Sequence, residues 1–199
     1  MSRPRTSRAL LFGALALLAA ACTGDGEDCD RLPGVRPGLC ITAPDDRGDA
    51  PTEPGPQLGD EAAELSVADF AGTPVVVNFW GSWCGPCRVE QPELNDVATT
   101  FADDVAFLGV NVQDPTANAL AYLREFEPPY DSIYDPRGDI AARFGGIGPS
   151  VMPSTLLLDA DGRVAVRLFG STTDTELTVL LDRLLEEDAT ASTASAARG

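Results

Sequence analysis

The fold is decided by the stretch from Val75 to Cys87, which reads VVVNFWGSWCGPC. Its first six residues are β-branched and aromatic apart from one asparagine, and such a run predicts a buried strand. A helical period follows over residues 84–101, where four apolar residues share one face: Leu94, Val97, Ala98 and Phe101. Cys84 and Cys87 therefore lie where a strand gives way to a helix.

Two cysteines separated by two residues at a helix start form and open a disulfide with little backbone motion. The helix N-terminus presents unpaired N–H groups and a partial positive charge, which stabilise a thiolate at Cys84. Because the thiolate is the nucleophile in disulfide exchange, we predict that Cys84 reacts first. Cys87, one turn further along, is predicted to be less accessible and to resolve the mixed disulfide.

Outside this stretch, strand and helix patterns alternate. Further strands are predicted at residues 105–112, 155–158 and 164–168, the last two joined by a hairpin at Asp161-Gly162. Helices are predicted at residues 117–126 and 140–144, followed by a last helix with the apolar stripe Leu177, Leu180, Leu181, Leu184 and Leu185. Thr173 and Glu176 fit a capping box for this helix. The order predicts an α/β fold with a central sheet flanked by helices.

Composition excludes several classes of mechanism. The 199 residues include 31 acidic and 14 basic side chains, for a net charge of −17, and no histidine. Without an imidazole there is no Ser-His-Asp hydrolysis, no Cys-His proteolysis and no histidine-ligated zinc, copper or haem. The acidic balance argues against a nucleic-acid partner, which would require basic patches.

The pair of cysteines has other interpretations. Half of a zinc site would need two further ligands, and c-type haem attachment would need a histidine where Arg88 stands. A thiol peroxidase signature would need proline at position 77 and serine or threonine at 81, where the chain has Val77 and Gly81. A copper chaperone is a further binding role, but the chain lacks its histidine ligands and its wider cysteine spacing. We therefore expect no metal and no cofactor.

The N-terminal residues have the pattern of a targeting sequence. Residues 1–21 combine a basic start with a short apolar run ending in small residues, which is typical of a secretory signal peptide. The run is shorter than the ~20 residues of a membrane-spanning helix. Residues 18–22 (LAAAC) resemble the lipobox of bacterial lipoproteins, which implies a lipid on Cys22. The alternative is ordinary cleavage that leaves this cysteine free.

The regions on either side of the predicted domain have the composition of linkers. Residues 22–56 are rich in proline and glycine and lack aromatic residues, so we expect an extended, lipid-anchored tether. Cys29 and Cys40 are expected to pair there, the alternatives being free thiols or a bond to another chain. The tail at 188–199 is rich in alanine, serine and threonine and is expected to be disordered.

The sequence FWGSWCGPC after a buried strand resembles the thioredoxin superfamily. The wider pattern resembles its extracytoplasmic TlpA/ResA-type branch of thiol-disulfide oxidoreductases, over residues 57–187. Glu90 and Pro92 match the E-x-P of that branch, residues 111–144 match its helix-bearing insert, and residues 152–155 (MPST) match its cis-proline loop. The resemblance implies a thioredoxin-like fold, with a central mixed β-sheet flanked by helices and an extra helix-bearing insert.

The resemblance also implies roles for individual residues. Glu90 would be a partly buried acid that accepts the proton of Cys87, the alternative being a solvated helix glutamate. Asn78 stands where cytoplasmic thioredoxins usually have a buried aspartate, and it cannot titrate. The bond before Pro153 would be cis, the alternative being a trans turn proline.

Five residues are expected to form the substrate-binding surface around the cysteines: Trp83, Gly85, Pro86, Met152 and Pro153. Trp83 would cover the site, and Pro86 would fix the first turn of the helix. With a cis bond, the peptide edge of Met152 would pair with an extended substrate.

Taken with the resemblance, these features predict a membrane-tethered, extracytoplasmic thiol-disulfide oxidoreductase. Its partners would be proteins with disulfides or dithiols, together with a membrane electron donor. We expect a monomer acting as a reductase, with apocytochrome c among the substrates that the resemblance implies. The alternatives are a dithiol oxidase and a binding lipoprotein whose disulfide is merely structural.

Overall fold

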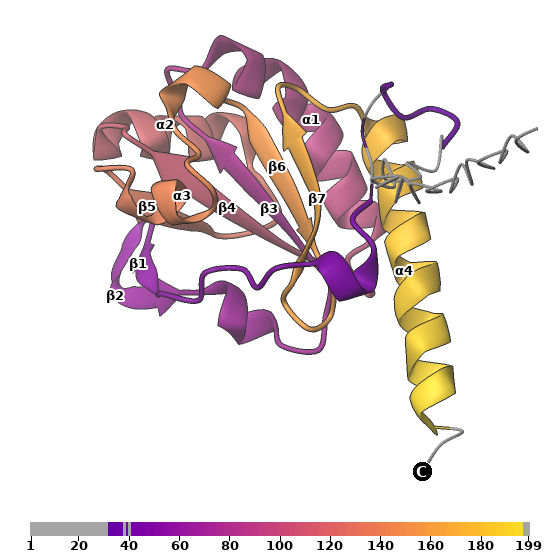
Figure 1. Cartoon of the computed structure of the whole chain (residues 1–199). Coiled ribbons are helices and arrows are strands. Elements are labelled where there is room, and N and C mark those ends of the chain that lie inside the picture. The colour runs from indigo at the N-terminus through magenta and orange to yellow at the C-terminus, as the bar shows by residue number, and fades with distance from the viewer. Residues whose placement is uncertain (1–31, 38, 40, 197–199) are drawn as a thin grey trace, which may run out of the picture.

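A computed structural model of the chain describes residues 32–37, 39 and 41–196 (Figure 1). The strands are β1 (Gly55–Gln57), β2 (Asp60–Leu65), β3 (Val75–Trp80), β4 (Ala106–Val112), β5 (Ser132–Asp135), β6 (Ser154–Leu158) and β7 (Val164–Phe169). The α-helices are α1 (Gly85–Thr100), α2 (Thr116–Phe126), α3 (Asp139–Arg143) and α4 (Asp174–Ala196). Three 3₁₀ turns complete the list: η1 (Pro44–Asp46), η2 (Val67–Phe70) and η3 (Pro149–Val151).

The strands form one mixed sheet in the order β2-β1-β5-β4-β3-β6-β7. The central strands β3, β4 and β5 are parallel, whereas β6 pairs antiparallel with β3, and β7 with β6. The predicted hairpin at Asp161-Gly162 is confirmed, with Gly162 at a positive φ of 77°. The fold is the α/β, thioredoxin-like arrangement that the sequence predicted, and α2, β5 and α3 form the insert after β4.

Alternate residues of β3 supply two cores, because neighbouring side chains of a strand point to opposite faces. Val75, Val77 and Phe79 pack on the face covered by α3 and η2. On the other face, Val76 packs with apolar residues of α1 and α4. Trp80 lies on that face too, where it packs with Cys84, Cys87 and apolar residues of α2. All six residues of β3 are buried, which explains why five of them are apolar; the sixth is the buried Asn78.

The segment expected as a tether is attached to the domain over much of its length. The Arg47 side chain is buried and forms ion pairs with Asp159 and Glu187, and Figure 1 shows η1 beside α4. Ala50 is buried in the core, and Gly55 begins β1. For these residues the expected tether is wrong, because buried ion pairs and a few apolar contacts hold a segment whose composition is poor in apolar residues.

The expectation of a disordered tail from residue 188 onward also needs correction. Helix α4 continues to Ala196, well past residue 187, and its last turns project beyond the body of the domain (Figure 1). Only half of the predicted capping box forms: Thr173 Oγ1 accepts from the Glu176 amide at 3.2 Å, but the Glu176 carboxylate binds Arg36 instead.

The predictions for residues 1–21, Cys22, Cys29 and Cys40 lie outside the described residues. Within the described part of the chain, no helix combines the length and apolar character needed to cross a membrane.

Candidate active site

Cys84 and Cys87 form a disulfide at the start of α1, with their Cα atoms 5.3 Å apart. Cys84 is the N-cap residue, and its Sγ accepts a hydrogen bond from the Cys87 amide at 3.2 Å. This amide is one of the donors that a helix start leaves unpaired, so the same contact would stabilise a thiolate at Cys84. Among the described residues, no three or more cysteine or carboxylate side chains are grouped so that they could hold a metal ion.

The disulfide is more enclosed than the sequence suggested. Cys84 is 4% exposed and Cys87 is 1% exposed, so in the oxidised form neither sulfur is open to solvent to any large extent. The expected contrast between an accessible and a buried cysteine therefore stays a prediction for the reduced protein. Around the disulfide, Trp83, Gly85 and Pro86 are all exposed, as expected of a rim.

Trp83 is held at this rim by the end of the neighbouring strand. Its side chain is 44% exposed, and its Nε1 donates to the Val112 carbonyl at 3.1 Å. A Cβ atom on Gly81 would lie 2.5 Å from the same Nε1. Glycine at position 81 therefore lets the indole fold back over the end of the sheet.

Glu90 lies one turn after Cys87 and is 3% exposed. One carboxylate oxygen accepts from the Thr172 amide at 3.1 Å, and the other accepts from Asn78 Nδ2 at 3.3 Å. Burial raises the pKa of Glu90 to about 7 against the opposing effect of these two hydrogen bonds. Glu90 is thus buried, and Asn78 is one of the groups that hold it, while its role toward the proton of Cys87 stays a prediction.

The cis-proline loop lies beside the cysteines because β6 runs antiparallel to β3. Ser154 pairs with Phe79, so the residues just before β6 meet those just after β3. The Met152–Pro153 bond is cis, as predicted, and Met152 packs against the cluster that contains both cysteines. The Pro153 carbonyl accepts from the Gly170 amide at 2.8 Å.

Two residues of the site were missed from the sequence. The hydroxyl of Tyr122 lies 3.1 Å from the Cys87 carbonyl, and its ring stacks on Trp80 with centroids 4.3 Å apart. Asp114 is buried and accepts from the amide and hydroxyl of Ser82, both at 2.6 Å. Asp114 could have been found from the sequence, because it follows β4. The carboxyl end of this strand lies beside that of the parallel strand β3, just before the cysteines.

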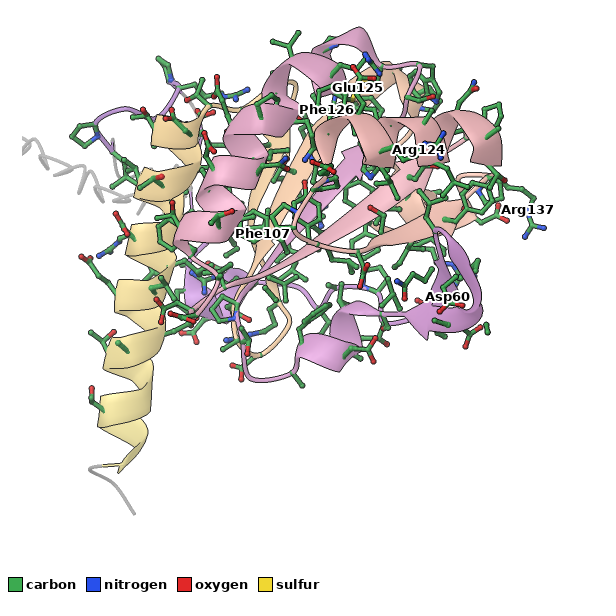
Figure 2. The ribbon with its side chains drawn as sticks, turned by 180° about the vertical axis from the view of Figure 1, so that it is seen from behind. Asp60, Phe107, Arg124, Glu125, Phe126 and Arg137 are labelled. Carbon is green, nitrogen blue, oxygen red and sulfur yellow. A yellow bond between two sulfur atoms is a disulfide. The ribbon has the colours of Figure 1, made fainter. Side chains whose placement is uncertain are left out.

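The insert helix α2 is joined to the active-site helix by Arg88. Its guanidinium pairs with Glu125 and lies 5.0 Å from the centroid of the Phe126 ring. Figure 2 shows Glu125 and Phe126 together where α2 meets α1. The insert therefore forms one wall of the cysteine site, as the packing of Tyr122 also indicates.

Comparison with known proteins places this geometry in a family. The model of the AhpC/TSA family matches residues 49–167. The thiol:disulfide interchange protein DsbE of Pseudomonas aeruginosa is 38% identical, over 58% of this chain and 61% of that protein, less than two thirds of its length. HelX of Rhodobacter capsulatus, also named a thiol:disulfide interchange protein, is 35% identical over 64% of this chain and 70% of that protein.

Solved structures of similar proteins have the same fold. The crystal structure of a DsbF homologue from Corynebacterium diphtheriae superposes with a TM-score of 0.68 at 32% identity, covering 75% of this chain and 96% of that one. A secreted thiol-disulfide isomerase from Corynebacterium glutamicum has the same TM-score at 31% identity, over 74% of this chain and 90% of that one. With its cysteine pair at the start of α1, the chain thus belongs to the thioredoxin-like AhpC/TSA family, among relatives that are named thiol:disulfide interchange proteins.

Proposed function

We propose that the protein is an extracytoplasmic thiol-disulfide oxidoreductase that exchanges electrons between Cys84/Cys87 and cysteine pairs of other proteins. The observation that carries this proposal is the disulfide at the N-terminus of α1, with Cys84 Sγ 3.2 Å from the Cys87 amide. The names of the relatives support the same reaction class.

In the reducing direction, the Cys84 thiolate attacks one sulfur of a substrate disulfide. A mixed disulfide forms, and the first substrate thiolate leaves. Cys87 then loses its proton and attacks Cys84 Sγ, which releases the second substrate thiolate and closes the enzyme disulfide. Two electrons pass to the substrate in each cycle, and an external dithiol donor must return the enzyme to its reduced form.

Glu90 is the proposed acceptor of the Cys87 proton. It lies three residues further along α1, a spacing that brings two side chains to the same face of a helix. A carboxyl group whose pKa is about 7 is half ionised near neutral pH, so it both takes up and returns a proton readily. Asn78, which does not titrate, donates a hydrogen bond to Glu90 and leaves the proton with it.

An apolar rim is the proposed docking surface for the substrate. Trp83, Val89 and Phe169 are exposed by 44%, 76% and 51%. Phe169 pairs with Ser154, next to Pro153, so the rim adjoins the cis-proline loop. There the backbone of Met152 is proposed to pair with an extended substrate segment, with Gly85 and Pro86 facing it from the other side.

The cellular setting of this reaction is also a proposal. A lipid on Cys22 would hold the protein at the outer face of a membrane, where a disulfide between Cys29 and Cys40 would be stable. The protein would act as a monomer, draw electrons from a membrane donor and reduce substrates that include apocytochrome c. Oxidation of dithiols is the alternative direction.

A redox titration combined with trapping tests the reaction class. The Cys84–Cys87 pair should equilibrate with glutathione or dithiothreitol buffers in the range of the thioredoxin family, roughly −120 to −270 mV. Cys87→Ser should accumulate mixed disulfides with other proteins through Cys84, whereas Cys84→Ser should not. A pair that stays oxidised below about −300 mV, with no trapped partner, would instead be a structural disulfide.

A further inference from the structure

Two buried carboxylates meet at Thr172, which joins β7 to α4. The Thr172 amide donates to Glu90 at 3.1 Å, and its hydroxyl donates to Glu176 at 3.1 Å. All three residues are less than 5% exposed. The active-site acid is therefore connected, through one threonine, to a second acid on α4.

Arg36, from the N-terminal segment, neutralises that second acid. Its Nε donates to Glu176 at 2.8 Å, and its backbone amide donates to the same carboxylate at 2.9 Å. Burial alone would raise the pKa of Glu176, but the hydrogen bonds and charge of Arg36 outweigh this effect and hold the pKa below its ordinary value. Glu176 is thus kept ionised beside Thr172 by a residue 140 positions earlier in the chain.

The same guanidinium holds the turn that carries Thr172. Arg36 Nη1 donates to the Phe169 carbonyl at 3.2 Å, and Nη2 donates to the Ser171 carbonyl. These contacts bracket the residues just before Thr172. Gly34 brings the segment close to α4, since a Cβ at that residue would lie 3.3 Å from Thr175 Cγ2.

We propose that Arg36 is a positioning residue for Glu90: it holds Glu176 and the 169–172 turn so that the Thr172 amide and a positive charge face the Glu90 carboxylate. The N-terminal segment would then be part of the active site's proton-transfer apparatus. The proposal rests on the proposed function of Glu90 only for its effect on catalysis, not for the contacts themselves.

The titratable and charged groups around Glu90 come from several elements. They are Glu93 on α1, Arg36 on the N-terminal segment, Glu176 on α4, and Tyr122 and Tyr130 on and after α2, while Cys87 does not titrate as long as it is in the disulfide. Burial raises the pKa of both tyrosines, so they stay neutral while Glu90 titrates. The charge of Glu93 raises the pKa of Glu90 and that of Arg36 lowers it, so Arg36 is the cation that opposes burial.

The test is a ¹³C NMR titration of the side-chain carboxyl groups in the oxidised full-length protein, labelled at glutamate. The Glu90 signal is assigned by its loss in Glu90→Gln. Arg36→Gln should raise the Glu90 inflection by ~0.5–1 pH unit, because a positive charge and the support of one hydrogen bond are lost. Glu176→Gln should lower it, because the positive charge of Arg36 is no longer offset by a carboxylate.

The two variants should shift the Glu90 inflection in opposite directions. If either substitution merely loosened the 169–172 turn, both variants would shift the inflection in the same direction. The control Arg137→Gln removes an exposed arginine that pairs with Asp139 and should leave the inflection unchanged. Shifts of the same sign, or no shift in either variant, would overturn the proposal. If Arg36→Gln does not fold, Glu176→Gln decides, since any change other than a fall contradicts the proposal.

Insulin reduction measured against pH separates this proposal from the role of Glu90 itself. If the inflections move as expected but the pH profile of Arg36→Gln matches the wild type, Arg36 positions Glu90 and the proton role of Glu90 is wrong. If Glu90→Gln changes the profile while neither variant moves the inflection, the proton role stands and the positioning role of Arg36 is wrong.

Discussion

Replacing Glu90 by glutamine should change the pH dependence of the free energy of unfolding. In the folded, oxidised protein burial raises the pKa of Glu90 from 4.5 to about 7, and in the unfolded chain the pKa returns to its ordinary value. The folded state therefore binds the proton more tightly. Its extra stability is fully present below about pH 4.5 and is lost as the pH rises through about 7.

The magnitude follows from the shift of the pKa. At 1.36 kcal/mol per pH unit, the contribution of Glu90 falls by ~3 kcal/mol between pH 4.5 and pH 8. For a domain of this size, ~3 kcal/mol corresponds to a difference of about 6–12 °C in Tm. Glu90→Gln keeps the shape of the side chain and removes the titration, so this part of the pH dependence should vanish.

Urea unfolding of the oxidised protein at pH 5 and pH 8 measures the effect. The quantity of interest is the change between the two pH values in the wild type minus the same change in Glu90→Gln, because the other carboxylates contribute equally to both. Asp96→Asn removes an exposed acid from the same helix and should give the wild-type pH dependence. A difference below ~0.5 kcal/mol between wild type and Glu90→Gln would show that Glu90 does not have a raised pKa.

Three further predictions follow from the site and its surroundings. In the reduced protein at pH 7, iodoacetamide should alkylate Cys84 much faster than Cys87, because the helix N-terminus stabilises the Cys84 thiolate; mass spectrometry identifies the label, and faster labelling of Cys87 would reverse the two roles. Cys22→Ala should move the protein from the membrane fraction to the soluble fraction while insulin reduction persists, and a membrane-bound variant would count against the lipid anchor. Gly109→Ala should destabilise the fold by ~1–3 kcal/mol in urea unfolding, since its Cβ would lie 2.1 Å from Ser132 Oγ; wild-type stability would mean that β4 and β5 can separate at no cost.

The central part of the fold could be predicted because its local signals agree. The apolar run of β3 and the period of α1 gave the boundaries of both elements to within a residue, and the helical spacing brought Glu90 to the face of Cys87. By contrast, β2 has the sequence DEAAEL, which carries no alternation of apolar and polar residues. An edge strand with three acids forms only because β1 offers it a partner, which the residues of β2 themselves do not indicate.

The surroundings of Glu90 were harder to predict for a similar reason. Asn78 and Thr172 lie 12 and 82 positions from Glu90, and Arg36 lies 140 positions from Glu176. No local period links such residues, since only the folded sheet brings them together. The composition of the N-terminal segment was misleading in the same way, because the ion pairs of Arg36 and Arg47 hold it to the domain together with a few scattered apolar contacts, such as those of Val35 and Ala50.

The attachment of that segment has a geometric consequence for the proposed anchor. Were residues 22–56 one free tether, its contour length would be about 120 Å, at up to 3.6 Å per residue. Because Arg36 and Arg47 fasten the chain to the domain, only the nine residues between Cys22 and Leu32, or ten Cα–Cα steps, would separate a lipid on Cys22 from the described structure. Ten such steps span at most about 36 Å, so the attached end of the domain would stay close to the bilayer. An enzyme confined in this way would select its substrates and its electron donor by their height above the membrane as well as by their chemistry.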